Sequence, residues 1–271
     1  MLTLNNYPDC YCETTSHKAL RSITSWVARL TWPLVLLSLI SCGELSSEQH
    51  IARAKDFLAQ SEYQSASIEL KNALQKDANS AEARWLLGKF YFETGDVLSA
   101  EKELSRAQEL GWDKSDLYPL LAKSLLAQNR LAAVRELPYE ALRPEAAATL
   151  LSTQALAELA QGDAEQAQDL IDRASEQKPG LLEADMVQAR IFASQGELRQ
   201  SLILLESILE RSPERREAWS LKGDILLRQQ KLEPAREAFD QSIALSESAF
   251  ADLMKRALIN LLLGQYDAAQ A

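Results

Sequence analysis

Residues 81–107 read AEARWLLGKFYFETGDVLSAEKELSRA, and this stretch decides the fold because its spacing recurs along the chain. Equivalent residues lie at a constant offset earlier in the sequence: Gly88, Tyr91, Gly95, Ala100, Leu104 and Ala107 correspond to Ala54, Phe57, Ser61, Ala66, Leu70 and Ala73. Each residue is small or large like its counterpart. Self-similarity at a fixed period of about 34 residues indicates a repeat architecture.

The same period continues toward the C-terminus after one interruption. It returns at Gly162, Ala167, Ile171, Ala174 and Pro179, and further steps give Ala189, Phe192, Gly196, Leu205 and Pro213, then Trp219, Gly223, Leu226, Ala235 and Phe239, then Ala257, Gly264 and Ala269. Small residues let two helices lie close together, and a glycine at a turn ends a helix in the left-handed conformation. The pattern therefore predicts a repeated helix–turn–helix unit.

A helix–turn–helix of this period, with this order of markers, resembles the tetratricopeptide repeat (TPR) family over roughly residues 47–271. The resemblance implies an all-α fold, a solenoid of antiparallel helix pairs that forms a right-handed superhelix. The units are expected at about 47–80, 81–114, 115–147, 148–181, 182–215 and 216–249, with a partial unit at 250–271.

The third of these units is irregular. It is one residue short, and Pro138 and Pro144 interrupt its second helix. We expect either a degenerate repeat or a second helix that ends early, in a loop around residues 137–144. Pro119 and Pro234 are less disruptive, because both are expected in the first turn of a helix, where proline is tolerated.

Composition agrees with a helical fold and argues against several functions. After Cys42 the sequence has only three Val and three Thr, so strands are disfavoured. The 29 Lys and Arg stand against 39 Asp and Glu, a net charge of −10, and nucleic-acid binding needs a basic face. With two His and three Cys, the sequence offers few candidate catalytic or metal-ligating residues, and it contains no glycine-rich phosphate loop for a nucleotide cofactor. We expect a protein that is not an enzyme, with no catalytic residues, metal or cofactor.

Residues 30–41, LTWPLVLLSLIS, form an uncharged apolar run between Arg29 and Cys42. Spanning a membrane takes about 20 residues, so this run is too short, but it fits a secretory signal peptide. Leu39-Ile40-Ser41-Cys42 resembles a bacterial lipobox, in which the cysteine receives the lipid. With Gly43 next, the resemblance implies a lipoprotein of a Gram-negative bacterium, in the outer membrane and facing the periplasm.

The segments before and after this cysteine then have separate roles. Residues 27–42 form the lipoprotein signal peptide, and residues 43–271 form the TPR array. Residues 1–26 are expected to be a non-native or disordered extension, with Val27 as an alternative start. At the other end, the last repeat stops without a polar cap. We therefore expect a longer solenoid, and association of this chain through Leu258, Leu261 and Leu262.

A narrower resemblance follows the lipobox directly. The runs EQHIARAK (48–55), IELKNALQKD (68–77) and AEARWLLG (81–88) resemble the TPR-repeat lipoproteins of the PEP-CTERM/exosortase system. That resemblance implies a role in exopolysaccharide biosynthesis or export, or in PEP-CTERM protein sorting. Two alternatives stay open: a general periplasmic TPR adaptor of an outer-membrane assembly or secretion complex, and a glycan-processing protein whose catalytic domain lies beyond residue 271.

The TPR resemblance also implies a binding face, since the first helices of the units line a concave surface. The family's inner-face positions fall on Lys55, Trp85, Lys89, Glu93, Lys123, Arg190, Asp224 and Arg228. The basic residues among them favour an acidic peptide or polymer as ligand. In the alternative interpretation each is a solvated helix residue, and Trp85 covers the gap between two units. The expected partners are proteins or peptides in the groove and a membrane through Cys42, but not nucleic acid.

Overall fold

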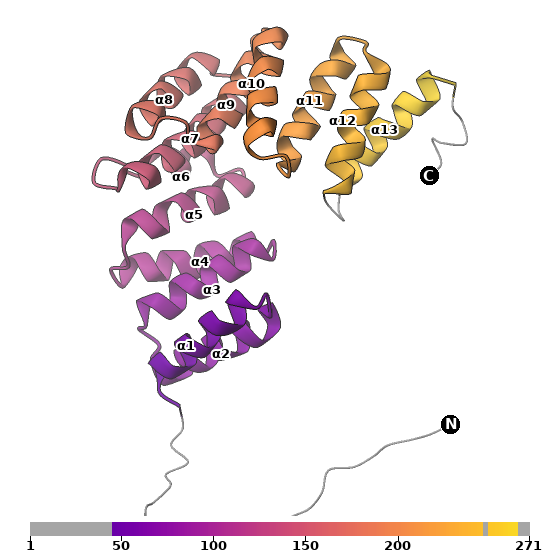
Figure 1. The fold of residues 1–271 in the computed structure, drawn as a ribbon. Coiled ribbons are helices and arrows are strands. Elements are labelled where there is room, and N and C mark those ends of the chain that lie inside the picture. The colour runs from indigo at the N-terminus through magenta and orange to yellow at the C-terminus, as the bar shows by residue number, and fades with distance from the viewer. Residues whose placement is uncertain (1–44, 246–248, 265–271) are drawn as a thin grey trace, which may run out of the picture. The chain divides into compact units, whose positions relative to one another are not determined.

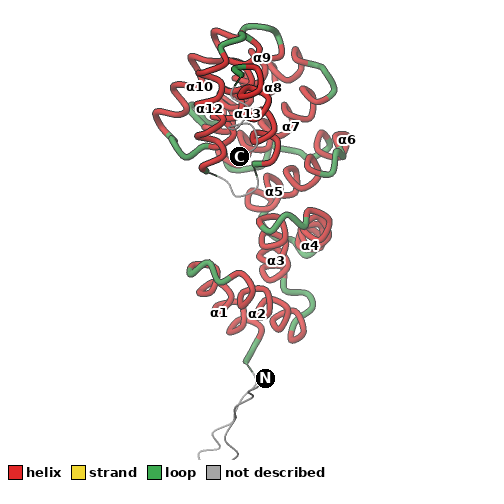
Figure 2. The backbone as a smooth tube through the Cα atoms, turned by 90° about the vertical axis from the view of Figure 1, so that its right-hand side faces the viewer, coloured by secondary structure: helices red, strands yellow, loops and turns green. Residues whose placement is uncertain are grey.

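The computed structural model describes residues 45–245 and 249–264, so the expectations for residues 1–26, for the signal segment 27–42 and for lipidation at Cys42 lie outside the described residues. The chain divides into two units, Met1–Gly43 and Glu44–Ala271, and every described helix belongs to the second. Figure 2 shows helices and loops, and no strand occurs among the described residues. The prediction of an all-α fold is confirmed.

Thirteen α-helices lie in the described residues, and consecutive helices pack as pairs that follow one another (Figure 1). The first helices of the pairs are α1 (Ser47–Ala59), α3 (Ala81–Glu93), α5 (Lys114–Ala127), α7 (Pro144–Ala160), α9 (Leu182–Ser194), α11 (Arg216–Arg228) and α13 (Phe250–Leu262). The second helices are α2 (Tyr63–Lys76), α4 (Val97–Glu109), α6 (Leu131–Arg135), α8 (Ala164–Gln177), α10 (Leu198–Arg211) and α12 (Leu232–Ala244).

The small residues of the repeat lie where the two helices of a pair meet. A Cβ atom added at Gly88 of α3 would lie 2.7 Å from Cγ of Leu104 on α4, and one added at Gly223 would lie 2.7 Å from Cε1 of Phe239. The alanines at the matching positions Ala54, Ala122, Ala155 and Ala189 are fully buried. Close helix contact is thus the physical reason for the small residues in the repeat.

The turn between the helices of a pair has a left-handed residue at the predicted position. Gly95, Gly162, Gly196 and Gly264 have φ between 74° and 86°. Three residues with side chains occupy the same place in the other units, and Ser61, Asn129 and Gln230 have φ of 60°, 57° and 59°. A side chain makes this conformation less favourable than it is for glycine, so these turns are strained.

The third unit departs from the others, because its second helix α6 ends at Arg135 after five residues, whereas the other second helices have 13 or 14. The side-chain amide of Gln154, on α7, donates to the carbonyl oxygens of Val134 at 3.1 Å and Leu137 at 2.9 Å. These hydrogen bonds satisfy backbone carbonyls at and just beyond the end of α6. The chain then leaves the helix as the segment 136–143. Helix α7 then begins at Pro144 and packs on both α5 and α8.

The expectation for Pro119 is wrong. Helix α5 begins at Lys114, because the Asp113 side chain caps it by accepting the backbone N–H of Ser115 at 2.8 Å. Pro119 is therefore the sixth residue of the helix and lies beyond its first turn. Pro234 lies at the third residue of α12, in the first turn as expected.

The last described helix has an exposed apolar face. Five large apolar side chains of α13 are 48–73% exposed: Phe250, Met254, Leu258, Leu261 and Leu262. Association through Leu258, Leu261 and Leu262 stays a prediction. None of the described helices is both long and apolar enough to span a membrane.

Candidate functional site

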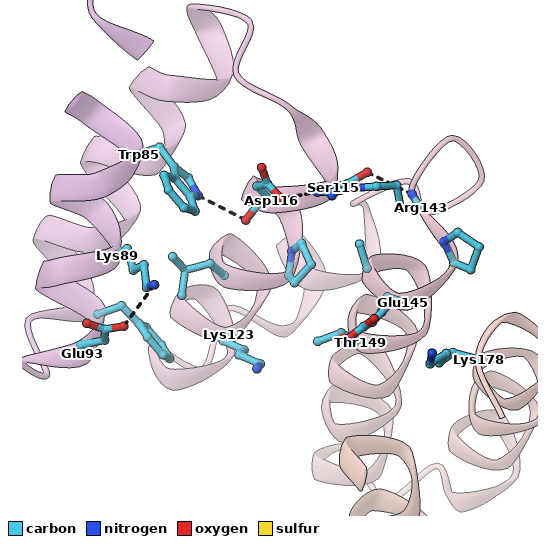
Figure 3. A pocket seen from close by; sticks show the side chains of 15 residues that line it. Trp85, Lys89, Glu93, Ser115, Asp116, Lys123, Arg143, Glu145, Thr149 and Lys178 are labelled. Atoms are coloured by element: carbon cyan, nitrogen blue, oxygen red, sulfur yellow. Dashed lines mark hydrogen bonds and ion pairs between the residues drawn. The ribbon is translucent and has the colours of Figure 1, made fainter. Parts of the chain in front are cut away.

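The first helices α3, α5 and α7 line a pocket of about 880 Å³ (Figure 3). Side chains reach it in steps of three and four residues along each helix, as neighbours on one helical face do. We call it the α3–α7 pocket; its lining residues are Trp85, Lys89, Phe92, Glu93, Ser115, Asp116, Pro119, Leu120, Lys123, Arg143, Pro144, Glu145, Ala146, Thr149 and Lys178.

A second pocket of about 350 Å³ continues from the first along the same row of helices. We call it the α5–α9 pocket; α5, α7 and α9 and the beginning of α11 line it with Lys123, Leu126, Ala127, Ser152, Thr153, Leu156, Glu183, Met186, Val187, Arg190, Arg215 and Glu217. Lys123 lines both pockets. We call the two adjoining pockets together the groove; their lining comes from five successive first helices, from α3 to the beginning of α11.

The apolar part of the α3–α7 pocket is built around Trp85. Its ring stacks on that of Trp112, with the ring centroids 5.4 Å apart. Its indole N–H donates to the backbone carbonyl of Asp116 at 3.3 Å. Trp85 also packs against the apolar clusters of two neighbouring units. It therefore covers the gap between units and at the same time offers a fixed aromatic surface to the pocket.

Several charged residues of this pocket are already paired. Nζ of Lys89 lies 3.8 Å from Oε1 of Glu93 and 5.9 Å from the ring centroid of Trp85. Arg143 forms an ion pair with Asp116, and its backbone N–H donates to Oγ of Ser115 at 3.0 Å. In Figure 3 these two pairs lie on different sides of the pocket, with Lys123 between them and Lys178 beyond Thr149. A charged group of a ligand could bind Lys89 or Arg143 only in competition with the carboxylates of Glu93 and Asp116.

Other charged residues of the groove have no ion-pair partner within the described part of the chain: the cations Lys123, Lys178 and Arg190, and the carboxylate of Glu145. In total six basic and five acidic residues line the two pockets, in a chain whose net charge is −10. The groove is thus slightly positive while the chain as a whole is strongly acidic. The three cations without an ion-pair partner in the described residues are the groups with which an acidic group of a ligand could pair.

The structure brings together five of the eight residues that the sequence predicts for the binding face. Trp85, Lys89, Glu93 and Lys123 line the α3–α7 pocket, and Arg190 lines the α5–α9 pocket. Their role as binding residues stays a prediction.

The other three residues line neither pocket. Lys55 pairs with Glu82 of the next unit at 2.5 Å, and Asp224 pairs with Lys255 at 2.6 Å. The guanidinium of Arg228 donates to the carbonyl oxygen of Ala193 at 3.2 Å. Each of these side chains bridges two neighbouring units, so their contacts support the solenoid.

Sequence reasoning missed every lining residue of α7, among them Thr149 and Leu156, and the lining residues next to helix ends. Arg143 precedes α7, Pro144 and Glu145 begin it, and Lys178 follows α8. The helical period does not place loop residues. The only signal was the irregularity at Pro138 and Pro144, and its effect depends on where α6 ends.

Buried titratable groups outside the two pockets have partners that tie helices together. Nδ1 of His50 lies 2.5 Å from Oε2 of Glu69, which links α1 to α2. Asp252 accepts hydrogen bonds from the hydroxyls of Ser220 at 2.8 Å and Ser242 at 2.6 Å. In the part of the chain that the structure describes, no three His, Cys, Asp or Glu side chains are grouped so that they could hold a metal ion.

Comparison with known protein families identifies the repeat. Models described as tetratricopeptide repeat match residues 57–123, 152–202 and 186–250, together more than half of the chain. No curated protein sequence matches the chain.

Solved structures share the fold at low sequence identity. A tetratricopeptide repeat protein from Parabacteroides merdae is 18% identical with a TM-score of 0.62, and the match covers 82% of this chain and 89% of that one. A monomeric IFIT1 mutant crystallised with Gppp-AAAA is 14% identical with a TM-score of 0.67, covering 83% and 57%. The Cut9–Hcn1 assembly of the APC/C gives 11% and 0.59, covering 81% and 47%. These likenesses confirm the helical repeat solenoid.

Proposed function

The chain belongs to the tetratricopeptide repeat family, and from this membership we propose that it is a non-catalytic scaffold that binds segments of other proteins along α3, α5, α7 and α9. Proteins built from such repeats generally mediate protein–protein interactions through the extended surface that stacked repeats create. The observation that carries the proposal is the groove made by two adjoining pockets that share Lys123.

The chemistry of the groove suits a protein segment. Binding energy at protein interfaces is concentrated in aromatic and apolar residues that exclude water, with polar groups around them. Trp85 provides such a surface, and its position is held by Trp112 and by the Asp116 carbonyl. Because the residue is already ordered, a ligand would not have to immobilise it on binding.

We further propose that a lipid on Cys42 tethers the scaffold to the outer membrane, where it serves exopolysaccharide export or PEP-CTERM protein sorting. Support comes from the sequence: an apolar run followed by Leu39-Ile40-Ser41-Cys42, and the similarity of residues 48–88 to lipoproteins of that system. Palmitate labelling of cells should mark the wild-type chain but not the Cys42→Ser variant. Labelling that survives Cys42→Ser would contradict the anchor. An exosortase or polysaccharide gene cluster beside this gene would support the finer role, and its absence would favour a general periplasmic adaptor.

The binding role is tested by photo-crosslinking in cells. The photoreactive analogue benzoylphenylalanine replaces Phe92, a half-buried aromatic residue of the α3–α7 pocket. The control replaces Tyr63, an exposed aromatic residue on α2 that lines neither pocket. Irradiation should give a protein adduct at position 92 and none at position 63. Adducts that form only at position 63, or at neither position, would contradict binding in the groove.

A further inference from the structure

We propose that the two pockets act as one bipartite site for an extended peptide segment with two large apolar side chains and an acidic residue between them. The apolar side chains occupy the α3–α7 and α5–α9 pockets, and the acidic residue pairs with Lys123. This inference rests on the proposed function and names the chemistry of the ligand.

Each pocket has its own apolar surface. Pro119 and Leu120 of α5 lie with Trp85 in the α3–α7 pocket, and Leu126, Leu156 and Met186 belong to the α5–α9 pocket. Removing a large apolar side chain from water is favourable in proportion to the area buried, so an apolar side chain of the ligand is stabilised in either pocket.

Lys123 is the charged residue best placed to pair with an acidic residue in the middle of the ligand. It lines both pockets, it is half-buried, and it has no ion-pair partner among the described residues. Lys89 differs, because it is paired with Glu93. A cation that is partly removed from water and lacks a counter-charge favours a carboxylate beside it.

The remaining charges place the acidic residue in the centre of the segment. Glu145, whose carboxylate has no ion-pair partner in residues 45–245 and 249–264, lines the α3–α7 pocket and repels an acidic group bound beside it. Arg190 lines the α5–α9 pocket, also without an ion-pair partner in those ranges, and tolerates a second acidic residue at that end. The expected segment is therefore acidic in the middle and toward the α9 side.

Helix spacing sets the distance between the two apolar residues. The α5–α9 pocket lies one first helix further along than the α3–α7 pocket. Packed helices are about 10 Å apart, and an extended chain advances about 3.3 Å per residue. The two anchors are therefore expected about three positions apart, at i and i+3, which lie on the same side of a segment in the polyproline II conformation, and the acidic residue is one of the two residues between them.

The test is a selection from a phage-displayed library of random peptides of about 12 residues, which span up to about 40 Å when extended. Full-length protein is the bait, and peptides that also bind a bait carrying Lys123→Glu are removed. The enriched peptides should share two large apolar residues at this spacing with Asp or Glu between them. Enrichment of basic peptides, of peptides without the paired apolar residues, or of none would overturn the proposal.

An enriched peptide is then synthesised with its central acid intact and with that acid changed to Lys. The acidic peptide should bind wild-type protein at least about tenfold more tightly, and Lys123→Glu should reverse that preference, since a like charge then faces the acid. The matched control is Lys102→Glu, at an exposed lysine on α4 outside both pockets. Circular dichroism establishes that each variant is folded, and Lys123→Gln, which should weaken binding of the acidic peptide, replaces Lys123→Glu if that variant unfolds.

An equal preference in all variants, or an equal effect of Lys102→Glu, would overturn the proposal. Its failure is distinct from that of the proposed function: a crosslink at position 92 with a partner that lacks the bipartite pattern overturns the ligand chemistry and leaves the scaffold role intact.

Discussion

The rings of Trp85 and Trp112 stack with their planes 24° apart, and this stack joins α3 to the segment that precedes α5. Trp85 is in contact with the apolar clusters of both units. One residue pair therefore serves two purposes, since it couples neighbouring repeats and holds an aromatic side of the α3–α7 pocket.

Replacing Trp112 by Ala should weaken both effects. The half-buried ring and its stacking are removed, so the free energy of unfolding should fall by about 2 kcal/mol. Affinity for a groove ligand should also fall, because Trp85 loses the ring that orients it. Trp112→Phe, which keeps an aromatic ring, is the control and should lose less. Urea denaturation measures the stability, and a variant as stable as wild type would show that the stack does not couple the units.

Gly223 faces the ring of Phe239, and a side chain at position 223 would clash with that ring. A Cβ atom at Gly223 would come within 2.9 Å of three ring atoms, and Phe239 is fully buried. Gly223→Ala should therefore destabilise the protein by about 1–3 kcal/mol, even though alanine favours helices.

A second substitution provides the control for this contact. Where Ala54, Ala155 and Ala189 occupy the matching position, the counterpart of Phe239 is Leu70, Ile171 or Leu205. Adding Phe239→Leu to Gly223→Ala should recover part of the loss, since it leaves room for the new methyl group. A double variant whose two losses simply add would contradict the contact.

The strained turns predict a stabilising substitution. Gln230 is exposed and has φ of 59°, a conformation that glycine adopts without steric cost. Gln230→Gly should raise the free energy of unfolding by about 0.5–1 kcal/mol, because relief of the strain exceeds the added freedom of the unfolded chain. The reciprocal change Gly196→Ala, at φ 82°, should lower it by about 1 kcal/mol. Thermal unfolding of both variants checks the sign, and equal shifts in one direction would refute the strain.

Gln154 is expected to hold the irregular unit together. In Gln154→Met the side chain keeps its approximate length but no longer donates to the carbonyls of Val134 and Leu137. The half-buried carbonyl of Leu137 loses this donor and that of Val134 keeps only backbone N–H groups, which should cost about 1–3 kcal/mol. Amide exchange should rise in residues 136–143 and stay unchanged in α1 and α2. If amide exchange in residues 136–143 is the same in this variant as in wild type, Gln154 does not hold the end of α6.

The regular part of the fold could be predicted from the sequence because its physics is local and periodic. The small residue at Gly88 and the left-handed turn at Gly95 have counterparts in the other units, and a helix turns the same face inward at each recurrence. The same periodicity places Trp85, Lys89 and Lys123 on one face of their helices, and the structure brings them to one pocket.

The rest depended on contacts between units. Whether a lysine is available cannot be predicted from its own helix: Lys55 is neutralised by Glu82 of the next unit, while Lys123 has no such partner in the described residues. Arg143 and Lys178 reach the pocket from the residues before α7 and after α8, and the position of Arg143 follows from the early end of α6, where Gln154 binds from another helix. Pro119 lies inside α5 rather than in its first turn, because Asp113 caps the helix and α5 begins at Lys114.

Lysine footprinting in living cells tests the groove most directly. A membrane-permeable acetylating reagent is applied to intact cells and to the purified protein, and the modification rate of each lysine is compared by mass spectrometry. Lys123 and Lys178 line the groove, whereas Lys71 on α2 and Lys102 on α4 are exposed outside both pockets. If partners bind in the groove, Lys123 and Lys178 should react several-fold more slowly in cells than in the purified protein, while Lys71 and Lys102 react equally in both. Protection of Lys71 and Lys102 with Lys123 and Lys178 unprotected would contradict the account.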